Sequence, residues 1–197
     1  AVGLVGSIAY FGFQNVRDYL LGNPSKSLLE GEWIASSYGY PPILLETPEV
    51  LFRKEVPLPP EAAASISDLD AFSYDNPKAH LSIATLSTMF IKADMPPDYE
   101  GAVDQVLAGF ERNGARNIIT KQEGFTTASG VEGVRVYGRG EFKMPDSEEY
   151  MKGRYNILLF GGNGFMQQVI ISWEDGDAYA EEIVNRILKT IEVKTVV

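Results

Sequence analysis

Three carboxylates in one short loop are the side chains whose spacing best suits metal chemistry. They lie in Glu174-Asp175-Gly176-Asp177. Hard cations such as Ca²⁺ prefer carboxylate oxygens, but this spacing does not match an EF-hand loop. An acidic residue before an amphipathic segment is also a typical helix N-cap. We therefore expect Asp175 or Asp177 to cap the following helix, and calcium ligation by the two is the alternative.

Histidine and cysteine chemistry is largely excluded by composition. The chain has one histidine, His80, and no cysteine. A histidine-based triad would need His80, and multi-histidine, thiolate and iron–sulfur sites are ruled out. His80 lies at the start of a predicted strand, which favours a structural role. We predict a non-enzyme without cofactor, and a carboxylate-based hydrolase or a calcium-dependent ligand-binding domain is the alternative.

The Gly161-Gly162-Asn163-Gly164 loop indicates a hairpin rather than a phosphate site. Phosphate cradles lead from a strand into a helix, whereas here a second strand follows. The flanking segments, Tyr155–Phe160 and Phe165–Trp173, are rich in β-branched and aromatic residues. Glycine and asparagine supply the positive φ angles that tight turns need.

Two amphipathic helices are predicted, and they would help to position any functional side chains of the chain. The first is predicted from Asp98 to Asn113 and the second from Asp177 to Ile191, because apolar residues recur there at helical spacing. The second helix has its apolar residues on one stripe, namely Ala180, Ile183, Val184, Ile187, Leu188 and Ile191. Such stripes pack on a sheet.

The remaining pattern predicts strands and therefore an α+β fold with a mainly antiparallel sheet. Ala79–Lys92 has no clearly polar face, which is typical of an interior strand. Glu61–Leu69 is expected to make a helical turn. The other strands are predicted at Trp33–Ser36, Ile43–Leu45, Val50–Val56, Ala71–Tyr74, Asn117–Thr127 and Val131–Phe142. Two helices provide too few crossovers for a parallel sheet.

The N-terminal segment predicts a membrane anchor. Residues 1–13 carry no charge, and the glycines and aromatic residues suit a membrane helix and its interface. We expect residues 1–24 to be the end of that helix, with Leu4, Val5, Ile8 and Phe11 facing lipid. A signal-sequence remnant and a core helix are the alternatives. Residues 25–32 are interpreted as a polar connector, and 33–197 as the folded domain.

Charge and surface residues point to protein partners. The 27 acidic and 17 basic residues give a formal net charge of -10, which disfavours nucleic acids and anionic lipids. Tyr38, Tyr40, Pro41 and Pro42 form an aromatic and proline cluster that suits a partner surface. Packing of the same residues against the edge of the core is the alternative.

The order of elements and the segment from Tyr155 to Val193 resemble the PsbP-like fold. That fold, an antiparallel sheet between helices, occurs in extrinsic photosystem subunits and bacterial lipoproteins. The resemblance covers Trp33–Val193 and rests on architecture, so no site residue is carried over. It implies a non-catalytic accessory domain that docks on other subunits of a membrane complex, on the extracytoplasmic side.

Overall fold

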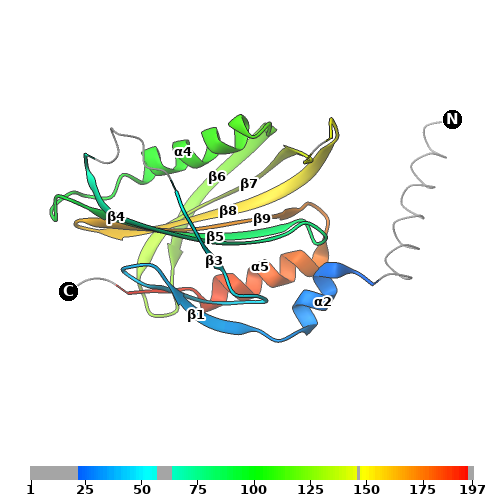
Figure 1. The fold of residues 1–197 in the computed structure, drawn as a ribbon, viewed down its shortest axis with the longest axis horizontal. Coiled ribbons are helices and arrows are strands. Elements are labelled where there is room, and N and C mark those ends of the chain that lie inside the picture. The colour runs from blue at the N-terminus through cyan, green and yellow to red at the C-terminus, as the bar shows by residue number, and fades with distance from the viewer. Residues whose placement is uncertain (1–21, 57–63, 146, 195–197) are drawn as a thin grey trace.

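The computed structural model describes residues 22–56, 64–145 and 147–194 (Figure 1). Of the anchor helix predicted over residues 1–24, residues 1–21 lie outside the described residues. The described helices are α2 (Pro24–Glu30), α4 (Tyr99–Arg112) and α5 (Ala178–Thr190). The described strands are β1 (Ile34–Tyr38), β2 (Ile43–Thr47), β3 (Phe52–Lys54), β4 (Ile66–Asn76), β5 (Leu81–Phe90), β6 (Arg116–Thr126), β7 (Glu132–Lys143), β8 (Tyr150–Gly162), β9 (Phe165–Glu174) and β10 (Glu192–Val193). The predicted α+β class is confirmed.

Every strand pairing in the described residues is antiparallel. The larger sheet has the order β3-β4-β5-β9-β8-β7-β6, and the smaller has the order β1-β2-β10. The long predicted strand is β5, which lies inside the larger sheet between β4 and β9. The pairings between consecutive strands follow from the sequence, because strands joined by short turns pair antiparallel. In contrast, β5 pairs with β9 and β2 with β10, and these strands are distant in the chain.

The two principal helices lie on opposite sides of the larger sheet (Figure 1). The apolar stripe of α5 packs into one core, which also contains side chains from β5, β8, β9 and the small sheet. Ile183 and Ile187 are fully inaccessible there. The second core lies between α4 and the other face of the sheet, and it contains Val136, Tyr155 and Ile157. Alternate residues of β8 therefore enter different cores, as the two-residue period of a strand requires.

The predicted hairpin is confirmed as β8 and β9. Gly162 pairs with Phe165, so the turn consists of Asn163 and Gly164. Gly164 has a φ of 84°, a value that other residues rarely adopt. The two earlier glycines of the loop belong to β8.

Two segments differ from the predictions. The expected connector begins with α2, because Asn23 Oδ1 accepts from the Lys26 N–H and Pro24 occupies the first turn. The Asn-Pro pair thus begins a helix, and Leu28 and Leu29 pack against the α5 core. The helical turn expected up to Leu69 is wrong for its described end, because β4 already begins at Ile66 and pairs with β5. Pairing between strands overrides the local preference.

Within the described ranges, no helix is long and apolar enough to span a bilayer.

Tyr155 and Tyr99 are expected to make the stability of the fold depend on pH in the alkaline range. Burial raises the pKa of Tyr155 above its ordinary value of 10.0, although the hydrogen bond with Thr120 opposes the shift. Burial also raises the pKa of Tyr99, opposed by a backbone hydrogen bond from Gly161. The unfolded chain therefore loses these protons first as pH rises, and the native state becomes less stable above pH 10.0.

We expect Tyr155→Phe to make this alkaline loss shallower. In urea unfolding at about pH 9 and about pH 11, the wild-type free energy of unfolding should fall more between the two pH values than that of the variant. The control is Tyr40→Phe, because Tyr40 is 54% exposed. If the free energy of unfolding of Tyr155→Phe fell between the two pH values as much as that of the wild type, the raised pKa of Tyr155 would be contradicted.

Candidate functional site

A groove with a cavity volume of about 520 Å³ lies between α5 and the strands β6, β7 and β8. Ligand pockets typically have volumes of about 300–1,000 Å³. Its walls combine basic, aromatic, amide and apolar side chains with one carboxylate. They come from Ile119, Lys121, Arg135, Tyr137, Gly138, Arg139, Arg154, Tyr155, Asn156, Trp173, Glu181, Val184 and Asn185. We call this site the basic groove.

Strand alternation places the polar side chains in the groove. Arg139 pairs with Arg154, and Tyr137 pairs with both Lys121 and Asn156. Directly opposed residues of antiparallel strands share a face, so these side chains gather on the α5 side. Their sequence neighbours, such as Val136, face the α4 core instead.

Two of the arginines are held by internal partners. Arg154 Nε donates to Asp175 Oδ1 at 2.5 Å, and its Nη1 lies 3.6 Å from Glu181 Oε1. The hydrogen bond to Asp175 and the charges of both acids raise the pKa of Arg154, against burial. Arg135 donates to Asn156 Oδ1 at 2.6 Å and to Glu123 at 3.1 Å.

The other two cations of the groove have no such partner. Among the described residues, Arg139 and Lys121 form no ion pair or side-chain hydrogen bond. Arg139 moreover lies directly across from Arg154, and like charges in this arrangement repel each other. The groove thus presents two available positive charges on an otherwise acidic protein.

Trp173 contributes a largely buried side chain to the lining of the groove. Its side chain is only 6% exposed, and its indole N–H has no acceptor within the described ranges. A buried donor without a partner is unfavourable by about 1–3 kcal/mol. The nitrogen itself is inaccessible to solvent, so the indole contributes apolar surface to the groove rather than an available donor.

The acidic loop proposed from sequence is engaged within the protein. Asp177 is the N-cap of α5, as predicted: Oδ1 accepts from the N–H groups of Tyr179 and Ala180, both at 3.0 Å. Its Oδ2 accepts from Ser25 Oγ at 2.6 Å. Asp175 pairs with Arg154, at the border of the groove. The described residues contain no cluster of three or more potential metal ligands.

The predicted aromatic and proline cluster is divided by the fold. Tyr38 is buried, and its hydroxyl accepts from the Leu51 N–H at 3.0 Å. Pro41 is buried, with its carbonyl accepting from Gln167 Nε2 at 2.8 Å. Pro42 is half-buried, whereas Tyr40 is 54% exposed. Only Tyr40 of the four is therefore fully available to a partner.

Two other sets of residues were proposed from the sequence, namely His80 and the lipid-facing residues of the predicted anchor. His80 is half-buried at the start of β5 with a φ of 48°. The predicted lipid-facing residues Leu4, Val5, Ile8 and Phe11 lie outside the described residues.

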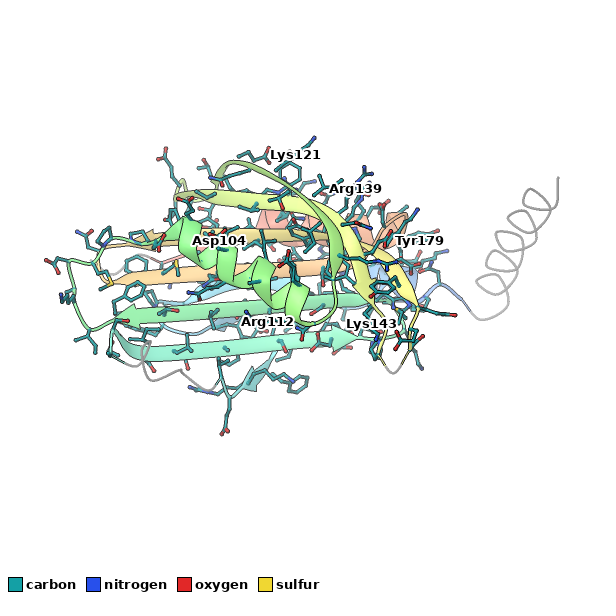
Figure 2. All side chains as sticks on the ribbon, turned by 90° about the horizontal axis from the view of Figure 1, so that it is seen from above. Asp104, Arg112, Lys121, Arg139, Lys143 and Tyr179 are labelled. Atoms are coloured by element: carbon teal, nitrogen blue, oxygen red, sulfur yellow. The ribbon has the colours of Figure 1, made fainter. Side chains whose placement is uncertain are left out.

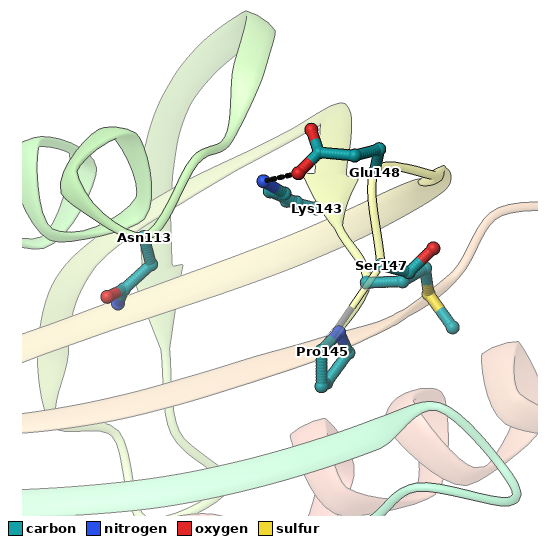
Figure 3. Close-up of a pocket in the computed structure, with 6 residues that line it drawn as sticks. Asn113, Lys143, Pro145, Ser147 and Glu148 are labelled. Atoms are coloured by element: carbon teal, nitrogen blue, oxygen red, sulfur yellow. Dashed lines mark hydrogen bonds and ion pairs between the residues drawn. The ribbon is translucent and has the colours of Figure 1, made fainter.

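A second hollow of about 510 Å³ lies between the end of α4 and the β7–β8 connection (Figure 3). Its charged groups are Lys143 and Glu148, which pair with each other at 2.9 Å. Exposed pairs of this kind contribute little free energy. The hollow offers no unpaired charge comparable to that of the basic groove.

The α4 side of the sheet carries a second candidate surface. Figure 2 shows α4 lying over the middle of the sheet, and no other described helix covers β4 or β5 on this side. Ile170, which packs on the α4 core, pairs with Ala84, which pairs with Ser73, which pairs with Phe52. Phe52 therefore shares that face, and it is 66% exposed. We call the surface formed by the exposed Phe52 and the half-buried Leu69, Ala84 and Leu86 the open sheet face.

The basic groove was not predicted from sequence, although a signal was present. Arg135, Tyr137 and Arg139 alternate with apolar residues along one strand, which places three polar side chains on one face. Trp173 and Glu181 come from later elements, and only the fold brings them to this strand. The sequence matches no protein-family model and no curated protein.

Proposed function

We propose that the protein is a non-catalytic docking subunit of a larger membrane-associated complex, and that it contacts its protein partner through the open sheet face. The observation that carries this proposal is the exposure of Phe52 on a part of the sheet that no described helix covers. Burying a phenylalanine side chain at an interface contributes about 1.5–3 kcal/mol.

The surroundings of Phe52 suit a protein partner. It lies on β3, the three-residue edge strand of the larger sheet, and a free edge offers backbone donors and acceptors. Val50 and Val56, on either side of the strand, are 40% and 46% exposed. Exposed apolar side chains grouped in this way are typical of interaction sites.

The membrane component of the proposal rests on the sequence. The uncharged run of residues 1–13 is suited to an anchor, and the resemblance to PsbP-like proteins supports an accessory role on the extracytoplasmic side. An acidic domain is repelled by anionic headgroups, so an anchor or partner would hold it at the membrane.

We expect Phe52→Ala to weaken partner binding by about tenfold or more, because buried aromatic residues dominate interface energies. The native full-length protein would be extracted from membranes in mild detergent, and its co-purifying partner quantified for wild type and variant. The matched control is Tyr179→Ala, since Tyr179 is also aromatic, is 36% exposed and lies on α5, on the opposite side of the sheet.

Two outcomes would contradict the proposal. In one, Phe52→Ala retains the partner at the wild-type level. In the other, the native protein leaves the membrane fraction without detergent and migrates as a monomer.

A further inference from the structure

The electrostatics of the basic groove favour a negatively charged ligand. Lys121, Arg135, Arg139 and Arg154 line it together, although acidic residues outnumber basic ones in the chain by 27 to 17. Glu123, Asp175 and Glu181 neutralise Arg135 and Arg154. The charges of Arg139 and Lys121 remain for a ligand.

These two cations are placed to act on one anionic group. Lys121 of β6 pairs with Tyr137 of β7, and the next pair on the same face is Ile119 with Arg139. Lys121 and Arg139 are therefore diagonal neighbours on adjacent strands. Diagonal neighbours across antiparallel strands lie about 7–8 Å apart, within reach of long side chains. Arginine and lysine both bind carboxylate and phosphate oxygens through charge-assisted hydrogen bonds.

The lining also contains apolar and aromatic side chains. Tyr137, Trp173, Val184 and Ile119 provide this surface. The indole nitrogen of Trp173 is inaccessible to solvent, so this residue contributes apolar surface only. A ligand with an anionic group beside an apolar body would match both the cations Arg139 and Lys121 and this part of the lining.

We infer that the basic groove binds a small amphipathic organic anion, in which a carboxylate or phosphate is attached to an aromatic or aliphatic body. The anionic group pairs with Arg139 and Lys121, and the body packs between Tyr137 and Val184. This site is on the α5 side of the sheet, whereas the open sheet face is on the α4 side. The inference is therefore independent of the docking proposal.

The test follows the indole N–H signals of the ¹⁵N-labelled full-length protein by NMR. The chain has two tryptophans. The Trp33 indole donates to the Leu29 carbonyl at 3.1 Å and serves as an internal reference, while Trp173 reports on the groove. Trp33→Phe assigns the two signals.

The probes are 2-naphthoate, 2-naphthyl phosphate, the neutral 2-naphthamide and inorganic phosphate. We expect at least one of the two naphthyl anions to shift the Trp173 signal saturably without moving that of Trp33. The tighter of the two identifies the preferred anionic group. Naphthamide and inorganic phosphate should bind at least about tenfold more weakly, since each lacks one half of the ligand.

Substitutions test the two cations. Arg139→Gln and Lys121→Gln should each weaken binding of the tighter naphthyl anion by about tenfold. The control Lys92→Gln removes an exposed lysine just beyond β5 and should leave the affinity within about twofold.

Three results would overturn the inference. One is the lack of a saturable Trp173 shift with either naphthyl anion. Another is naphthamide binding as tightly as the anions. The third is wild-type affinity in both the Arg139 and Lys121 variants, provided that their spectra show a folded protein.

Discussion

Replacing Phe160 with alanine is expected to lower the free energy of unfolding by about 3–5 kcal/mol. Phe160 is fully inaccessible in the α5 core, and its ring lies 5.8 Å from that of Phe125 in an edge-to-face arrangement. The substitution leaves a cavity where the larger sheet, the small sheet and α5 meet. A domain is typically stable by about 5–15 kcal/mol, so the loss is a large fraction of the total.

Phe52→Ala is the matched control for this substitution. The same side chain is removed, but Phe52 is 66% exposed, so the free energy of unfolding should change by less than about 1 kcal/mol. Urea unfolding monitored by circular dichroism measures both variants. Similar losses for the two would contradict the described packing. A stable Phe52→Ala variant also ensures that any loss of partner reports on binding.

Asp177→Ala is expected to destabilise the protein by about 1.5–5 kcal/mol. Loss of an N-cap costs about 0.5–2 kcal/mol. The Ser25 hydroxyl, whose residue is fully buried, would lose its acceptor at a cost of about 1–3 kcal/mol. This carboxylate therefore joins α2 to the start of α5, and its removal affects both helices.

Asp177→Asn should cost much less, because an amide oxygen can still accept from the N–H groups of Tyr179 and Ala180. Ser25→Ala should cost less in the Asp177→Ala background than in the wild type, since the two residues form one hydrogen bond. Additive losses in this double-mutant cycle, measured by urea unfolding, would contradict the contact.

The effect of calcium on the thermal midpoint tests whether the acidic loop only caps α5 or also binds metal, the alternative that the sequence left open. A metal bound only to the native state raises the thermal midpoint by mass action. Because Asp175 and Asp177 already have protein partners, we expect calcium to leave the midpoint unchanged. A rise that disappears when both residues are changed to asparagine would contradict this expectation.

The sequence alone was sufficient for elements defined by local patterns. The β8–β9 hairpin was predictable because Asn163 and Gly164 adopt a tight turn between two strongly β-forming segments. Helices α4 and α5 were predictable from the helical spacing of their apolar residues. The capping role of Asp177 was predictable from its position directly before α5. These features depend on neighbours within a few residues, and that is the range over which sequence patterns carry direct structural information.

Tertiary structure decided the features that depend on distant residues. Asn23 and Pro24 are compatible with either the end or the start of a helix, and the packing of Leu28 and Leu29 on the α5 core favours the start. Tyr38 and Tyr40 are two residues apart, yet one is buried and the other exposed, because the β1–β2 turn leaves the core between them. The basic groove exists only because β6, β7, β8, β9 and α5 meet. Strand register determines which side chains face each other, and register is set by pairing across the whole sheet.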